Sequence, residues 1–107
     1  MAMTEKRRKP REHRVALEAD LVISGAAGLH ARLGKVLSEP APVVLDAAAV
    51  ARLDTSGLQL LLAFVQARKQ AAGEWRWENV GDGLREAAAL LGMHKLLELP
   101  DALPANH

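Results

Sequence analysis

Apolar residues follow a helical spacing in one stretch and form a continuous run in the next. Leucine and valine recur every three to four positions over residues 26–37, as on one face of a helix, and Pro40 and Pro42 end that stretch. Residues 43–45 are all apolar and lead into Asp46, which is typical of a strand buried on both faces. We therefore expect a helix over 26–37 followed by a central strand.

The same alternation continues in the second half of the chain. A leucine-rich stripe over residues 58–65 predicts a second helix, with Arg68 at its wetter end and Gly73 as its stop. Residues 75–78 alternate apolar with polar side chains, as a half-buried strand does. A third helix over residues 84–91 is expected to follow.

The two ends of this region are less regular. Residues 14–18 and 21–24 are short runs separated by Ala19 and Asp20, which predicts an opening hairpin. Residues 96–99 predict a short closing strand or a helical turn. The whole pattern predicts an α/β domain in which about three helices pack on a mixed sheet of four to five strands.

Charge divides the chain into a basic tail and an acidic domain. The chain has 107 residues and a net charge of +1. Residues 1–14 hold six basic and two acidic side chains, net +4, while the remainder holds eight and eleven, net −3. We expect a mobile basic tail over 1–13, one domain over 14–100 and a C-terminal tail over 101–107. No aromatic residue interleaves the basic charges, which favours a solubilising arm over a nucleic-acid-binding segment or an anionic-membrane patch.

Several chemistries are excluded by composition and spacing. The chain has no cysteine, and its four histidines show no metal-ligand spacing, so no thiolate chemistry, metal or cofactor is expected. The segment 28–35 resembles a phosphate loop but has the wrong glycine spacing, and Val36 stands in place of the Mg²⁺-binding hydroxyl. No secretory signal or membrane-spanning stretch is evident. A cytoplasmic protein that is not an enzyme is the expectation.

One constellation remains, at the start of the second predicted helix. Asp54, Thr55 and Ser56 all suit a helix N-cap, and Gly57 would relieve crowding there. The alternative is a phosphorylatable hydroxyl at the positive end of a helix dipole, beside Asp54 and the strand-end Asp46. A phosphate on Thr55 or Ser56 would add charge to this acidic patch and expel a docked partner, so both interpretations stay open.

These segments together resemble the STAS family, the sulphate-transporter and anti-sigma-factor-antagonist domains. The resemblance covers about residues 14–100. It rests on Val43-Val44-Leu45-Asp46, on Leu53-Asp54-Thr55-Ser56-Gly57-Leu58, on Trp75-Arg76-Trp77-Glu78-Asn79-Val80, and on the third helix ending at Gly92-Met93. It implies a STAS-like (SpoIIAA-like) fold, with helices packed mainly on one side of a four-to-five-stranded sheet, that acts as a binding module.

The resemblance also implies site residues and partners. In anti-sigma antagonists the hydroxyl after the motif aspartate is phosphorylated by a partner kinase, a position held here by Thr55, with Ser56 as second choice. The partner-binding residues implied are Asp46, Asp54, Thr55, Ser56, Gly57 and Leu58. The partner is an anti-sigma or chemotaxis-type kinase, or alternatively the ATPase subunit of an ABC transporter for membrane lipids. A monomer or weak dimer is expected, with no nucleic acid bound and no membrane insertion.

Overall fold

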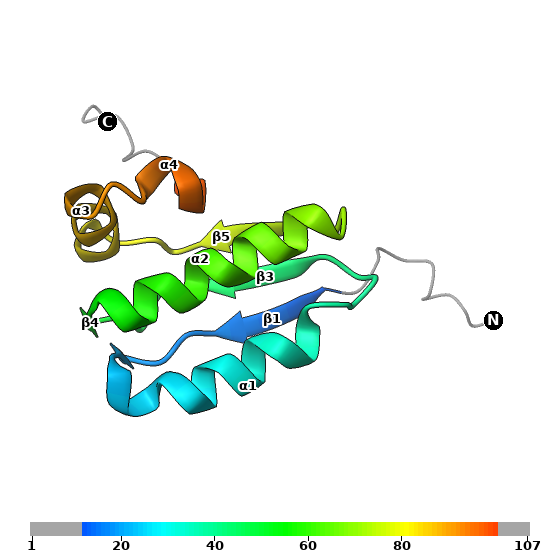
Figure 1. The fold of residues 1–107 in the computed structure, drawn as a ribbon, viewed down its shortest axis with the longest axis horizontal. Helices are drawn as coiled ribbons and strands as arrows, with labels where there is room; N and C mark the ends of the chain where they lie inside the picture. The colour runs from blue at the N-terminus through cyan, green and yellow to red at the C-terminus, as the bar shows by residue number, and fades with distance from the viewer. Residues whose placement is uncertain (1–11, 101–107) are drawn as a thin grey trace.

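The computed structural model describes residues 12–100, in which short parallel strands alternate with helices (Figure 1). The elements in chain order are β1 His13–Ala16, β2 Asp20–Leu21, the single 3₁₀ turn η2 Ile23–Gly25, α1 Ala26–Val36, β3 Val43–Asp46, β4 Arg52–Leu53, α2 Thr55–Gln70, β5 Trp75–Glu78, α3 Asp82–Leu90 and α4 His94–Leu97. The expected helices and the expected strand over 75–78 are thereby confirmed. Of the two alternatives for residues 96–99, the structure has the helical turn. Most of the predicted tails, 1–11 and 101–107, lies outside the described residues.

The α/β fold class is confirmed, but the strand pairing differs from the expectation. The described strands form a three-stranded sheet in the order β1-β3-β5 and a separate β2-β4 pair, and every pairing is parallel. The predicted mixed sheet and opening hairpin are therefore wrong for the described residues. The chain does not reverse after β1, because the Leu17 amide still donates to the Asp46 carbonyl (2.9 Å). The Ala19 carbonyl then accepts from the Arg52 amide (2.9 Å), and the chain continues into β2.

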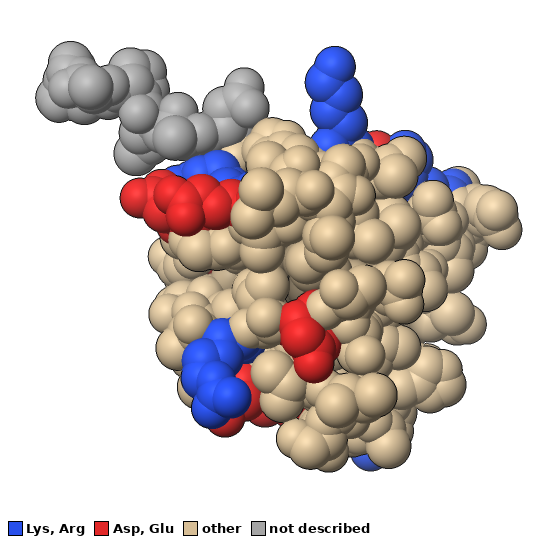
Figure 2. All heavy atoms as spheres, turned by 60° about the vertical axis from the view of Figure 1, so that its left-hand side comes forward, with Lys and Arg blue, Asp and Glu red and all other residues tan. Residues whose placement is uncertain are grey.

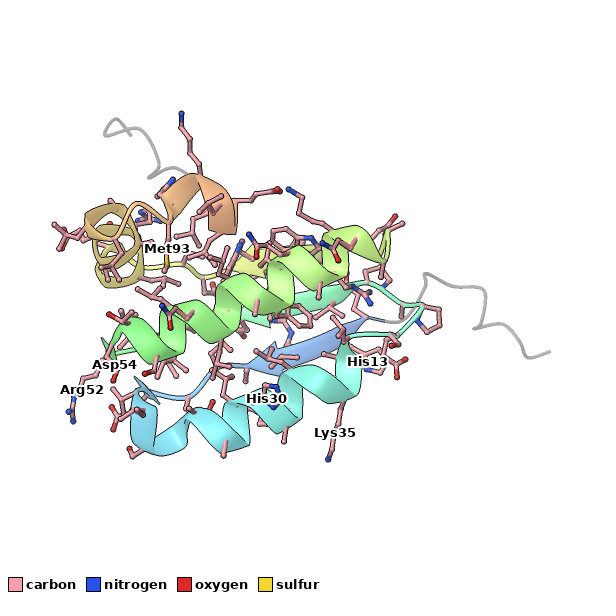
Figure 3. All side chains as sticks on the ribbon, viewed as in Figure 1. His13, His30, Lys35, Arg52, Asp54 and Met93 are labelled. Carbon is pink, nitrogen blue, oxygen red and sulfur yellow. The ribbon has the colours of Figure 1, made fainter. Side chains whose placement is uncertain are left out.

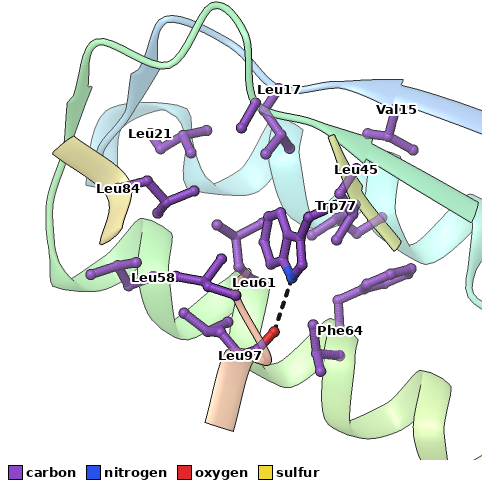
Figure 4. Packing of buried hydrophobic residues seen from close by; sticks show 14 of the residues in the cluster. Val15, Leu17, Leu21, Leu45, Leu58, Leu61, Phe64, Trp77, Leu84 and Leu97 are labelled. Atoms are coloured by element: carbon purple, nitrogen blue, oxygen red, sulfur yellow. Dashed lines mark hydrogen bonds between the residues drawn. The ribbon is translucent and has the colours of Figure 1, made fainter. Parts of the chain in front are cut away.

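The core lies on one face of the three-stranded sheet, and all four α-helices contribute to it (Figure 4). Val15, Leu45 and Trp77 stand in register across the three strands and point into this core. The Trp77 indole is buried, and its Nε1 donates to the Leu97 carbonyl (2.9 Å), which joins β5 to α4. Trp75 is half-buried and packs edge-to-face on Trp77, with 6.4 Å between ring centroids. The helices thus pack on one side of the sheet, as the STAS resemblance implies.

Charged side chains cover the opposite face of the sheet, called here the open face. Arg14, Val44 and Arg76 stand in register on it, and Val44 is fully buried although it lies outside the core cluster. The long aliphatic stems of the two arginines shield it from water while their charged ends stay exposed. Asp46 and Glu78 form the next row, and both pair with Arg14.

The far end of α2 contains a buried arginine where the sequence predicts a wet surface. Arg68 is 1% exposed, and its guanidinium donates to the carbonyls of Leu37 (2.9 Å), Glu39 (2.8 Å), Ala41 (2.8 Å) and Glu74 (3.0 and 3.1 Å). The prediction of an exposed Arg68 is wrong because its five N–H donors converge on these carbonyls, and within residues 12–100 only the Glu74 carbonyl has another backbone donor, the Val43 amide (3.0 Å). The Leu37 carbonyl belongs to the C-cap of α1, at the negative end of the helix, where a cation is favoured.

None of the helices within residues 12–100 is long and apolar enough to cross a membrane.

Candidate functional site at the start of helix α2

Asp54 forms the N-cap of α2 and binds two segments at once. Its backbone is extended (φ −131°, ψ −176°), and its Oδ1 accepts from the Gly57 amide (3.1 Å), which confirms the capping interpretation. Its Oδ2 accepts from the Ile23 amide (3.0 Å), just before α1. Both carboxylate oxygens therefore have backbone partners, and the aspartate fastens the start of α2 to the segment that leads into α1.

Gly57 and Leu58 support the turn from beneath. A Cβ on Gly57 would lie 2.3 Å from the carbonyl oxygen of Leu21, so only glycine lets the helix approach β2 this closely. Leu58 is 1% exposed and packs in the core. A contact of these two residues with a partner stays a prediction. Because both are buried, they hold the turn in place and do not face solvent.

Thr55 is the first residue of α2 and is exposed, whereas Ser56 is half-buried. None of the side-chain hydrogen bonds found within residues 12–100 uses the Thr55 hydroxyl. It stands at the positive end of a helix 16 residues long, where an anionic group is favoured. Of the two hydroxyls predicted as phosphorylation sites, that of Thr55 is therefore the more accessible.

Asp46 lies on the open face of the sheet and does not join the turn. Its Oδ2 accepts from Arg14 (2.9 Å), and its Oδ1 accepts from Asn79 Nδ2 (3.0 Å) and the Ala48 amide (3.0 Å). The hydrogen bonds from Asn79, Ala48 and Arg14 lower the pKa of Asp46. The sequence predicts one acidic patch formed by Asp46 and Asp54. The structure separates the two residues, because Asp46 lies on the open face and α2 packs on the opposite face. Strand alternation places Asp46 on the same face as Val44, two residues earlier, but residues 43–45 are all apolar, so the sequence does not tell which face the helices cover.

Sequence reasoning missed two neighbours of the turn. Ile23 is 70% exposed, and its amide is the one bound by Asp54. Arg52 is exposed two residues before the cap, where Figure 3 shows it close to Asp54, and it pairs only loosely with Asp20 (3.9 Å). In the sequence, Ile23 can be recognised as a large apolar residue that lies outside the apolar stripe of the first helix.

The surface around the turn is mostly uncharged. Figure 2 brings this end of the molecule forward and shows isolated acidic and basic side chains in a broad uncharged surface. A hollow of about 370 Å³ lies between β4 and α3, with Arg52, Leu53, Gly83 and Leu84 among its lining residues. Such a surface suits a protein partner. Within residues 12–100 no group of histidine and carboxylate side chains is arranged to hold a metal ion.

Comparison with known proteins identifies the class of domain. A family model described as "Mlab, STAS domain" matches residues 4–98, so the chain belongs to the STAS family. A solved structure of the Bacillus cell fate determinant SpoIIAA in its phosphorylated form is 17% identical, with a TM-score of 0.60 over 90% of this chain and 86% of that one. A sulfate transporter family protein from Wolinella succinogenes is 18% identical, with a TM-score of 0.66 over 88% and 79%. The search of curated proteins found no match. At these identities the structures establish the fold, which is SpoIIAA-like.

Proposed function

We propose that this protein is a non-catalytic regulatory module of the cytoplasm that binds an ATP-using partner protein through the Asp54–Gly57 turn. The observation that carries the proposal is an exposed Thr55 hydroxyl on a turn that is otherwise internally satisfied. Asp54 is held by two backbone amides and Gly57 by contact with Leu21. The backbone of the turn is therefore held in place before a partner docks, which lowers the ordering cost of binding.

Phosphorylation of Thr55 is the regulatory step of this proposal. The partner kinase transfers the γ-phosphoryl group of ATP to the Thr55 Oγ1: the bond to ADP breaks, a new P–O bond forms, and the hydroxyl proton passes to a base of the kinase. The product adds about −1.5 to −2 charges to a mostly uncharged surface. The helix N-terminus tolerates this charge, so the fold persists while the docked surface changes. The fold shared with the phosphorylated form of SpoIIAA supports this choice.

A second candidate is the STAS subunit of an ABC transporter for membrane lipids. The name Mlab in the matching family description favours it. In this case the same turn contacts the ATPase subunit, and binding does not depend on phosphorylation. The two candidates share the contact surface and differ in the partner and in the chemistry at Thr55.

Parallel pull-downs with an identified product test the proposal. Wild type, Thr55→Ser, Thr55→Glu and Ser38→Glu are immobilised, and retained ATP-binding proteins are identified by mass spectrometry. Ser38 is exposed in the loop after α1, so its variant adds the same charge away from the turn. We expect Thr55→Glu to lose the partner and the other three to keep it. Equal retention by Thr55→Glu and Ser38→Glu would refute a contact at the turn. Recovery of a kinase that phosphorylates Thr55 selects the first candidate, and recovery of an ABC ATPase selects the second.

A further inference from the structure

The outer strands of the three-stranded sheet are β1 and β5, and their free edges differ. On β1 the Leu17 amide donates toward β3, so the backbone groups of Ala16 face outward. The Ala16 carbonyl is bound by the guanidinium of Arg32 in α1, and Glu18 holds that guanidinium in place (2.6 Å). A charged side chain therefore blocks this edge, which is a common protection of edge strands against pairing.

The edge of β5 is open and lines a hollow of about 740 Å³. The Glu74 carbonyl accepts from β3, so by alternation the backbone groups of Trp75 and Trp77 face away from the sheet. None of the hydrogen bonds found within residues 12–100 uses these outward backbone groups. The hollow runs along residues 73–77. An open edge of this kind pairs with another strand when one is available.

We propose that two copies of this chain pair through β5, antiparallel and centred on Trp75, about a two-fold axis. The hollow extends two residues to either side of Trp75, so a strand centred there matches its length. The pairing places the Trp75 residues of the two copies side by side, and tryptophan is enriched at contacts between proteins. Because Arg32 blocks the edge of β1, the sheet cannot grow further and the assembly closes at two copies.

The charges on β5 select this register over its neighbours. In it Glu74 lies opposite Arg76 of the second copy, and the two-fold axis forms this pair twice. Glu74 is exposed and takes part in none of the ion pairs found within residues 12–100. A contact centred on Arg76 would instead set the two Arg76 side chains against each other and Glu74 against Glu78. A contact centred on Trp77 would leave Glu74 opposite Val80.

Arg76 is accessible to this contact although it has partners on its own chain. Its side chain is 46% exposed and pairs with Glu12 (2.6 Å) and Glu78 (2.6 Å). Exposed ion pairs of this kind are individually weak, so the guanidinium can turn toward Glu74 of the second copy. The paired strand has only four residues, so we expect a weak and reversible dimer.

The pairing leaves the Thr55 turn of each copy uncovered. Thr55 begins α2, and β5 follows the other end of that helix, which is 16 residues or about 24 Å long. The dimer therefore presents two such turns, and its formation does not depend on the proposed partner contact.

Sedimentation velocity of the full chain at increasing concentration tests the pairing. We expect a reversible change from the chain mass of 11.5 kDa to twice that mass. Glu74→Lys places like charges opposite Arg76, and Arg76→Glu places like charges opposite Glu74, so each variant should raise the dissociation constant about tenfold or more. An equimolar mixture of the two variants restores both opposite-charge pairs and should dimerise about as tightly as wild type. Glu86→Lys, on the exposed side of α3, is the matched control and should dimerise like wild type.

Amide hydrogen exchange locates the contact on the wild-type chain. The amides of Trp75 and Trp77 donate to the second copy in this register, so both should exchange more slowly in a concentrated sample than in a dilute one. Arg76→Glu also removes two ion pairs, so circular dichroism checks its fold, while the exposed Glu74→Lys and the exchange data decide without it.

Three results would overturn the proposal. One is a mass that stays at 11.5 kDa up to the highest soluble concentration. Another is a dimer that forms without slower exchange of the Trp75 and Trp77 amides, or that Glu74→Lys forms as tightly as wild type. The third is slow exchange of both amides in a monomer, since a different segment would then occupy the edge.

Discussion

The two ends of α2 are held by different chemistry. At the C-terminal end, Arg68 is 1% exposed and binds carbonyls from the end of α1, from the following loop and from Glu74. At the N-terminal end, a single cap residue, Asp54, secures the turn, and Thr55 stays exposed. At the C-terminal end the polar groups of Arg68 stabilise the fold, whereas at the N-terminal end the Thr55 hydroxyl is exposed, where we propose that a partner binds. The comparison predicts that substitutions at the first end change stability and substitutions at the second change binding.

Removal of the Arg68 guanidinium is expected to give the largest effect. Arg68→Met leaves the carbonyls of Leu37, Glu39 and Ala41 without these donors, whereas the Glu74 carbonyl keeps its bond from the Val43 amide. Since each buried unsatisfied group costs about 1–3 kcal/mol, the free energy of unfolding should fall by about 3 kcal/mol or more. Urea denaturation measures it. The neighbouring Lys69→Met removes only an exposed pair with Glu98 and should cost less than about 1 kcal/mol. Similar losses of unfolding free energy for the two variants would contradict the stabilising role of the buried Arg68 guanidinium.

Gly57→Ala should rank second. Its Cβ would lie 2.3 Å from the Leu21 carbonyl oxygen, so the start of α2 must move away from β2. We expect a loss of about 1–3 kcal/mol in unfolding free energy. Gly34→Ala, in α1 with no atom within 4 Å of the new Cβ, should instead stabilise the protein by about 0.5–1 kcal/mol. Thermal unfolding of the two variants should shift in opposite directions, and a shift in the same direction would refute the packing argument.

Asp54→Ala removes the cap and its link to Ile23. The Gly57 and Ile23 amides lose their acceptor, and stability should fall by about 1–2 kcal/mol. Asp54→Asn keeps an oxygen for the Gly57 amide and should recover most of this loss. Equal losses for the two variants, measured by urea denaturation, would show that the charge rather than the cap geometry matters.

Acid titration should show a smaller effect from the open face. Hydrogen bonds from Arg14 and Arg76 lower the pKa of Glu78. The pKa values of Asp46 and Glu12 are also lowered by the hydrogen bonds that these carboxylates accept. The folded state therefore binds fewer protons than the unfolded state near the ordinary carboxyl pKa of about 4. This stabilisation is present above that pH and is lost as pH falls through the lowered folded pKa values.

Arg14→Gln should flatten this dependence, because it removes the ion pairs to Asp46 and Glu78. The unfolding free energy of the variant should rise less steeply with pH between about pH 2 and 5 than that of the wild type. Lys35→Gln, on exposed α1, is the matched control and should keep the wild-type slope. An unchanged slope in Arg14→Gln would contradict the assigned causes.

Substitution of Thr55 should have the smallest effect on stability. Thr55→Ala removes an exposed hydroxyl for which residues 12–100 show no side-chain partner, so the unfolding free energy should stay within about 0.5 kcal/mol of wild type. Thermal unfolding measures the difference. A loss of 2 kcal/mol or more would mean that the hydroxyl serves the fold, as Arg68 does, and would remove the contrast between the two ends.

Periodicity and capping residues in the sequence suffice to predict the helices, the central strand β3 and the cap at Asp54. These features depend on neighbours within a few positions. The parallel β2-β4 pair and the buried Arg68 could not be predicted this way, because they depend on contacts across about 30 residues. The misplacement of Asp46 beside Thr55 has a different origin: sequence proximity to the end of a strand does not say which face of the sheet a side chain occupies.

Site-directed crosslinking at the two ends of α2 tests the central claim most directly. Because the chain lacks cysteine, Thr55→Cys and Gln70→Cys each carry one photoreactive label, at the first and last residues of α2, both exposed. Each labelled protein is irradiated in native lysate, and crosslinked products are identified by mass spectrometry. The account predicts a dominant crosslink from position 55 to one ATP-binding protein and none to that protein from position 70. Equal crosslinking from both positions, or capture of that protein only from position 70, would contradict it.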